Sequence, residues 1–198
     1  MDFNAIIKRA VGILTKPNDE WKVIKGESAT IQDLFLKYAI FLAAIPAIAG
    51  FLGWILIGRS FLGITVRAPF GNSILWAIFS YVFSLAGVFL LGFIIDSLAP
   101  SFGSKKDLVV SMKVAVYAYT AIWVAGIFYL IPNISFLAFI GGLYSLFLLY
   151  MGIKDLKEPP QDKAVGYFAA TIVIALVISV IIGMLVTLIA FGSARFWM

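Results

Sequence analysis

Asp96 is the side chain with the clearest potential for chemistry. It lies in FIIDSLAPSFGSKKD, residues 93–107, directly after an apolar run, and no other acid comes this close to the interior of a hydrophobic stretch. One interpretation is an ion or proton site, because a carboxylate within a membrane is costly and usually functional. The other is an interfacial carboxylate held by Lys105 or Lys106 and by free backbone N–H groups. The sequence leaves both interpretations open.

Three tyrosines, Tyr117, Tyr119 and Tyr144, supply further polar groups in apolar surroundings. Their hydroxyls could line a polar path together with Asp96, which would make the protein a small transporter or channel for an ion or a small polar solute. Aromatic residues at membrane interfaces and hydrogen bonds between helices explain such tyrosines equally well.

Catalytic and metal-binding chemistry is not expected. The chain has no His and no Cys, so it lacks imidazole bases, thiolate nucleophiles and thiolate metal sites. It carries no Gly-rich phosphate loop, zincin motif or serine elbow. The basic residues flank apolar stretches and form no patch of nucleic-acid size. We therefore predict a protein that is not an enzyme, with no catalytic, cofactor or metal site and no nucleic-acid partner.

The elements that must position these residues are membrane helices. Hydrophobic residues make up 63% of the 198 positions and charged residues 13%, which is a membrane composition. A lipid-exposed backbone must satisfy its hydrogen bonds within its own segment, and the alternation of a barrel strand is absent. A turn signal at Pro132 and Asn133 divides a double-length apolar stretch into two helices. We predict an all-α integral membrane protein, a bundle of five transmembrane helices at about residues 35–57, 74–97, 110–131, 134–153 and 164–192.

The distribution of charge predicts the orientation. Of the 15 basic residues, twelve fall before the first span or in the second and fourth loops, and three fall on the opposite side. All ten acidic residues share the side of the twelve. Because basic residues are retained in the cytoplasm, the N-terminus is predicted to be cytoplasmic and the C-terminus outside.

Residues 1–30 are predicted to form a cytoplasmic or interfacial amphipathic segment ahead of a membrane domain over 31–198. Its first helix places Lys8 and Arg9 opposite an apolar face, and a second short helix begins at Pro17 and carries Trp21. Such a segment suits anionic headgroups or a protein partner. The residues expected to make these contacts are Lys8, Arg9, Trp21, Lys105 and Lys106.

Two capping patterns and several pairs of small residues complete the local signals. Thr30 with Asp33, and Ser104 with Asp107, each match the pattern that opens a helix. Small residues recur four apart within the spans, which permits close packing either inside one chain or in a homo-oligomer. These pairs are Ser80 and Ser84, Ala121 and Ala125, Gly141 and Ser145, and Ser179 and Gly183.

Four stretches together resemble prokaryotic members of the Yip family, named for eukaryotic membrane proteins that interact with Ypt/Rab GTPases. These stretches are ILTKPNDEWKVIK, FIIDSLAPSFGSKKD, KVAVYAYTAIWVAGIFYLIP and GLYSLFLLYMGIKDLKEPPQDKAVGY. The resemblance implies five helices, a cytoplasmic N-terminus and a prokaryotic plasma (inner) membrane location. The Asp-Leu-Tyr-Gly-Pro motif of eukaryotic members is matched only at Asp33, Leu34 and an aromatic Phe35, and the Gly-Tyr pair of the third span is Ala118 and Tyr119 here. GTPase binding is therefore not carried over to this chain.

The family resemblance implies a non-enzymatic membrane adaptor or organiser that acts through its cytoplasmic face in trafficking-like or membrane-organising roles. Asp33, at the remnant of the family motif, joins Asp96 and the three tyrosines as a candidate functional residue. The alternative is the small transporter or channel, with Asp96 in its pathway.

Overall fold

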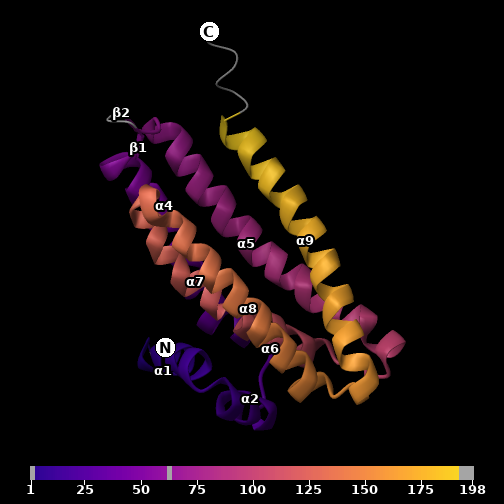
Figure 1. The fold of residues 1–198 in the computed structure, drawn as a ribbon. Helices are drawn as coiled ribbons and strands as arrows, with labels where there is room; N and C mark the ends of the chain where they lie inside the picture. The colour runs from indigo at the N-terminus through magenta and orange to yellow at the C-terminus, as the bar shows by residue number, and fades with distance from the viewer. Residues whose placement is uncertain (1–2, 62–63, 192–198) are drawn as a thin grey trace.

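The protein is a bundle of five apolar helical spans with two short helices packed across one end (Figure 1). The computed structural model describes residues 3–61 and 64–191. The five membrane-spanning segments confirm the predicted all-α membrane protein. They cover Ile31–Ile57, Phe70–Phe102, Leu108–Leu130, Pro132–Lys157 and Gln161–Leu185.

Each span is assembled from one or more helical pieces. The first contains α3 (Ile31–Leu34), η1 (Phe35–Ala39), α4 (Ile40–Leu52) and η2 (Gly53–Ile57), and the second contains α5 (Phe70–Leu98) and η3 (Ala99–Phe102). The third contains α6 (Leu108–Ala118), α7 (Thr120–Ala125) and η4 (Gly126–Leu130). The fourth contains η5 (Pro132–Leu137), α8 (Ala138–Gly152) and η6 (Ile153–Lys157), and the fifth belongs to α9 (Gln161–Phe191). The first and third spans begin ahead of the predicted positions because polar side chains, Thr30 and Asp107, cap their first helices. The predicted end of the fifth span at residue 192 lies outside the described residues.

The helix starts follow local chemistry. The hydroxyl of Thr30 accepts a hydrogen bond from Asp33 N at 3.1 Å, which confirms the predicted start of α3. At α6 the cap is Asp107, whose carboxylate accepts from Val110 N at 3.0 Å. The prediction that Ser104 opens this helix is therefore wrong, because residues 104–107 are still irregular loop and the helix begins at Leu108. Gly103, with φ of 76°, ends η3 in a left-handed conformation that suits glycine.

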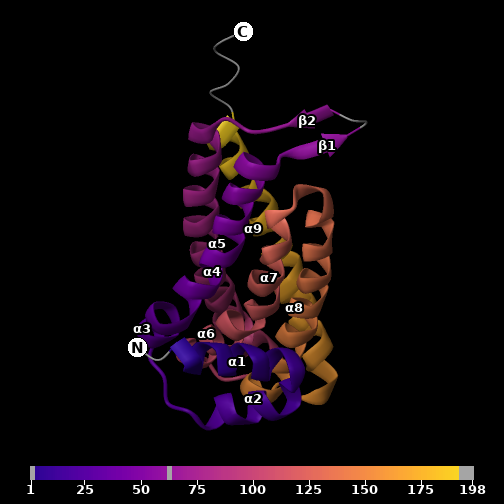
Figure 2. The same cartoon turned by 90° about the vertical axis from the view of Figure 1, so that its left-hand side faces the viewer.

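A small β-hairpin joins the first two spans, where only a loop was expected. Strands β1 (Arg59–Phe61) and β2 (Ile64–Val66) pair antiparallel, with Ser60 opposite Thr65. Asn133, at the start of the fourth span in η5, accepts from Ser60 N at 3.2 Å and donates to Ser60 O at 3.3 Å. Figure 2 shows the hairpin extending above the tip of the α7–α8 pair. We call this region the hairpin end.

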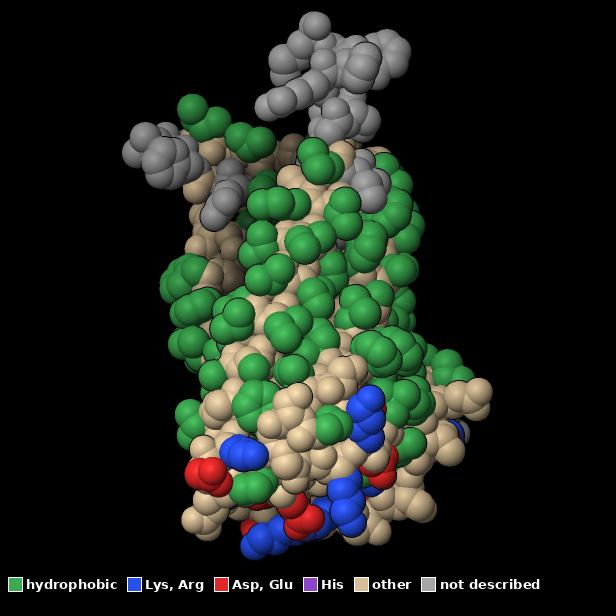
Figure 3. All heavy atoms as spheres, turned by 90° about the vertical axis from the view of Figure 1, so that its right-hand side faces the viewer, with side chains coloured by type: hydrophobic (Ala, Val, Ile, Leu, Met, Phe, Trp, Pro, Cys, Tyr) green, Lys and Arg blue, Asp and Glu red, His purple; other side chains and the backbone are tan. Residues whose placement is uncertain are grey.

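The third span forms the centre of the bundle and the fifth lies at its edge. In the most apolar window of the third span 61% of the residues are buried, compared with 6% in the fifth. The fifth span, α9, lies alongside α5 (Figure 1), and apolar side chains cover this face of the molecule (Figure 3). Such a face suits hydrocarbon, where an apolar surface needs no cover.

Small residues serve packing within the chain. A side-chain carbon added at Gly141 would lie 2.8 Å from Ala121 O, so α8 contacts α7 at glycine distance. Ser84 accepts a hydrogen bond from the Trp123 indole at 2.9 Å. A side-chain carbon added at Gly183 on α9 would meet no atom of the described residues within 4 Å. Gly183, one of the small residues expected at a homo-oligomer contact, therefore lies on an outward-facing part of α9.

Candidate functional site

Charged side chains gather at the end of the bundle opposite the β-hairpin. Figure 3 shows them below a wide apolar band. This charged end consists of α1 (Phe3–Thr15), α2 (Pro17–Gly26), the link from α2 through α3 and η1, the end of α5, the loop from η3 to α6 with the first turns of α6, and η6 with the start of α9. In the described part of the chain it holds every acidic residue, and the basic residues beyond it are Arg59, the first residue of β1, and Arg67, which directly follows β2.

The helices α1 and α2 form a platform that packs across the charged end (Figure 2). Trp21 is fully buried, and a side-chain carbon added at Gly152 of α8 would lie 2.8 Å from its ring. The Tyr144 hydroxyl donates to Leu14 O at 2.9 Å. The platform therefore rests on the bundle itself, and Trp21, expected at a lipid or partner contact, is an internal packing residue.

Lys113 anchors the platform from inside the bundle. The charge distribution counted it with the second loop, although residue 113 falls inside the predicted span of 110–131; it lies within α6 with 5% of its surface exposed. Its ammonium donates to Ile24 O at 3.0 Å and to Glu27 O. These carbonyls lie at the C-terminal end of α2, where a cation is favourable. The signal in the sequence for this anchoring role was a lysine inside a mostly apolar helix.

Arg9 links α1 to the segment that follows it. Its guanidinium donates to Glu20 at 2.5 Å and to Glu27, and it lies 5.7 Å from the centre of the Tyr117 ring. Partial burial alone would lower the pKa of Arg9, but the hydrogen bond to Glu27 and the nearby carboxylates raise it above its ordinary value. Arg9 therefore turns inward, whereas Lys8 remains exposed on the outer surface.

Asp96 binds the loop between the second and third spans. Its carboxylate accepts from Asp107 N at 2.8 Å and from the Ser111 hydroxyl at 3.2 Å, and it lies 3.7 Å from the Lys157 ammonium. Lys157, whose side chain is 1% exposed, also donates to Lys105 O at 2.8 Å. The expected partners Lys105 and Lys106 are both exposed, so the cation comes instead from η6, more than 50 residues along the chain.

The three candidate tyrosines do not converge on one path. Tyr117 packs its ring against Trp21 and Tyr38, and Tyr144 is bonded to α1. Tyr119 lies on the other side of the third span, 5.8 Å from the Trp123 ring, and lines a cavity of about 230 Å³. Asp33, in the first turn of α3, accepts a hydrogen bond from the capping Thr30 hydroxyl and pairs with Lys37. Each candidate residue therefore has a separate structural environment.

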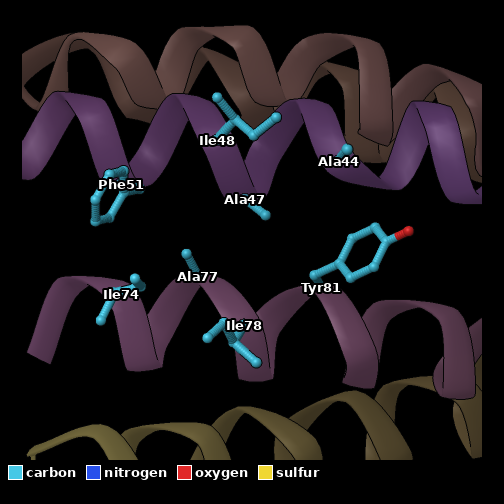
Figure 4. A pocket seen from close by; sticks show the side chains of 8 residues that line it. All are labelled: Ala44, Ala47, Ile48, Phe51, Ile74, Ala77, Ile78 and Tyr81. Atoms are coloured by element: carbon cyan, nitrogen blue, oxygen red, sulfur yellow. The ribbon is translucent and has the colours of Figure 1, made fainter. Parts of the chain in front are cut away.

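Two hollows on the molecule differ in chemistry. The first is a groove of about 300 Å³ between α4 and α5, and Figure 4 shows that its lining is almost entirely aliphatic and aromatic. Its one hydroxyl, on Tyr81, donates to Ile40 O at 3.0 Å. The groove thus offers no ligand for an ion.

The second hollow lies at the charged end, between the η3–α6 loop and η6, and also measures about 300 Å³. We call it the loop cavity. It is lined by Gly103, Ser104, Lys105, Asp107, Val110, Leu156, Lys157 and Glu158. Within the residues that the structure describes, no three or more Asp or Glu side chains come together in a way that could hold a metal ion.

Comparisons with known proteins agree with the architecture. The family model of the Yip1 domain matches residues 11–197. The chain is similar to the inner membrane protein YohC of Escherichia coli strain K12, with 28% identity over 190 residues that cover 93% of this chain and 97% of the relative. The YohC protein of Escherichia coli O6:H1 strain CFT073 matches to the same extent. No solved structure matches significantly.

Proposed function

This chain belongs to the Yip1 domain family and is a multi-pass inner membrane protein, and from that premise we propose that it is a non-enzymatic membrane organiser. In this proposal the charged end faces the cytoplasm and presents the α1–α2 platform to a partner protein. The excess of basic residues at this end supports the orientation.

The observation that carries the proposal is an apolar stripe on the outer surface of α1. Its inner face already buries Ile6, Ala10 and Ile13 against the bundle. Phe3, Ile7 and Val11, each one helical turn from the next, remain 63%, 48% and 52% exposed. Since the inner face suffices to dock the helix, the outer stripe is available for an external contact.

The surroundings of the stripe favour a partner with apolar and acidic groups. Lys8, Lys16 and Lys22 are exposed on the same platform. The platform is held by buried anchors at Trp21 and Lys113, so it would meet a partner with little ordering cost. An amphipathic helix with acidic flanks has the chemistry that matches this surface.

A photo-crosslinking experiment tests the proposal. A benzophenone amino acid replaces Val11, and a second chain carries it at Phe139, which is 69% exposed on the apolar side of α8. We expect Val11 to give a discrete protein adduct in cells and Phe139 to give lipid adducts. Lys8→Glu with Lys22→Glu should diminish the protein adduct, whereas Arg67→Glu at the hairpin end should not. Lipid adducts alone at Val11 would assign the stripe to the headgroup layer and exclude the docking role.

A further inference from the structure

We propose that the loop cavity binds a phosphoethanolamine group, a phosphate joined to an amine. The proposal does not depend on a protein partner. Two sources could supply this group, namely the headgroup of phosphatidylethanolamine and a free phosphorylated amine, and the cavity lies where the second and fourth spans end and the third begins.

The first indication is an unpartnered hydroxyl. Ser104 is 8% exposed, and among the described residues no group donates to or accepts from its Oγ. Buried polar groups are nearly always hydrogen-bonded, so a hydroxyl that lines a cavity without a protein partner must find its partner in what fills the cavity, a water molecule or a ligand. Ser104 lines the loop cavity, so its hydroxyl is placed to donate to an oxygen bound there.

The second indication is the positive charge around this hydroxyl. The exposed Lys105 borders the cavity, and the buried Lys157 lies beneath the loop, held by Lys105 O and Asp107 O. The first turn of α6, a helix of 11 residues, also opens at the cavity, where Val110 forms part of the lining. The leading N–H groups of a helix lack intrahelical acceptors and favour an anion. Here Val110 N is already bound by the Asp107 carboxylate, so this turn contributes through the positive end of the helix dipole. Together these groups match a phosphate.

The cavity also carries negative charge, which a bare phosphate would not pair with. Asp107 and Glu158 both line it. Among the described residues one oxygen of each is engaged, that of Asp107 by Val110 N and that of Glu158 by Lys25. The Lys105 ammonium and the two carboxylates border the same space, whereas the Lys157 ammonium is already bonded to Lys105 O and Asp107 O and lies beside Asp96. A ligand with one negative and one positive group would satisfy both signs of charge at the border. An anionic headgroup without an amine would meet unpaired carboxylates.

The test uses the purified full-length protein in detergent micelles. Native mass spectrometry measures retention of phosphatidylethanolamine and of phosphatidylglycerol with the same acyl chains, and a separate titration uses free O-phosphoethanolamine. We expect phosphatidylethanolamine to be retained selectively. Binding of free O-phosphoethanolamine at concentrations similar to those of the lipid would also support the phosphoethanolamine site and would indicate that its ligand is a soluble compound.

The variants separate binding from folding. Ser104→Ala should weaken binding roughly tenfold, the effect of one hydrogen bond to a charged group. It should not lower the unfolding temperature of the ligand-free protein, because it removes a buried hydroxyl that has no partner among the described residues. Lys105→Gln should also weaken binding, while its exposed neighbour, in Lys106→Gln, serves as the matched control. Equal retention of both lipids, no retention, or full retention by Ser104→Ala would overturn the proposal.

Discussion

Three basic side chains at the charged end act as internal clips. Lys113 caps the last carbonyls of α2, Lys157 binds the carbonyls of the η3–α6 loop, and Arg9 joins two glutamates. In each case the charge reaches oxygen acceptors contributed by another element. Cations that favour a cytoplasmic location for this end thus also hold it together.

Lys113→Met should release the platform. The substitution keeps most of the buried volume but leaves Ile24 O and Glu27 O without their ammonium donor. The cost to docking should be about 1–3 kcal/mol, and amide exchange over residues 3–26 should accelerate by about fivefold or more while the spans stay protected. Hydrogen exchange by mass spectrometry measures both regions. Lys106→Met is the exposed control, and unchanged protection of α1 and α2 would show that Lys113 does not anchor them.

Asp96→Asn should lower stability without abolishing the loop. The amide oxygen can still accept from Asp107 N, but the charge that faces the buried Lys157 is lost. At 3.7 Å, with carbonyls sharing the ammonium, the expected loss is about 1–2 kcal/mol in thermal unfolding. Adding Lys157→Met should recover part of it. If Asp96→Asn instead abolished solute flux in reconstituted vesicles without changing stability, the result would support the interpretation of Asp96 as an ion or proton site.

At the scale of elements, the sequence predicts a feature when the residues that produce it are close together in the chain. The spans follow from runs of apolar residues longer than the membrane is thick, and the start of α3 follows from Thr30 and its neighbours. The pairing of Asp96 with Lys157 depends on the approach of η6, and the clip from Asn133 to Ser60 depends on two turns meeting. Their partners are far apart in sequence, so no local pattern reveals them.

The docking of α2 offers a test at this scale. Trp21→Ala removes a fully buried ring that fills the space above Gly152. Truncating a buried Trp costs about 3–5 kcal/mol, and that loss should fall on the platform, since α2 is joined to the bundle by a short link. Limited proteolysis should then cut within residues 16–30 while the five spans remain intact. Val23→Ala, on the exposed side of the same helix, should leave the pattern unchanged. Cleavage that begins within the spans would instead mean that α2 supports the whole fold.

The whole molecule is polarised between a charged end and a hairpin end, with an apolar band between them (Figure 3). The platform closes the charged end, so that the bundle meets its surroundings there through α1, α2 and two loops. At the hairpin end a few hydrogen bonds hold the β-hairpin over the turn between the third and fourth spans. An asymmetry of this kind would place protein and headgroup contacts at one side of the membrane.

The orientation can be measured directly because the chain has no cysteine of its own. Lys106→Cys and Arg67→Cys each introduce one exposed thiol, at the charged end and the hairpin end respectively. Basic residues resist transfer across the membrane, and moving one charge against a potential of 100 mV costs about 2.3 kcal/mol. We therefore expect a membrane-impermeant maleimide to label Arg67→Cys in intact cells and to label Lys106→Cys only after the membrane is disrupted. The reverse pattern, or equal labelling of both in intact cells, would contradict a cytoplasmic charged end and remove the platform from the compartment in which its proposed partner must lie.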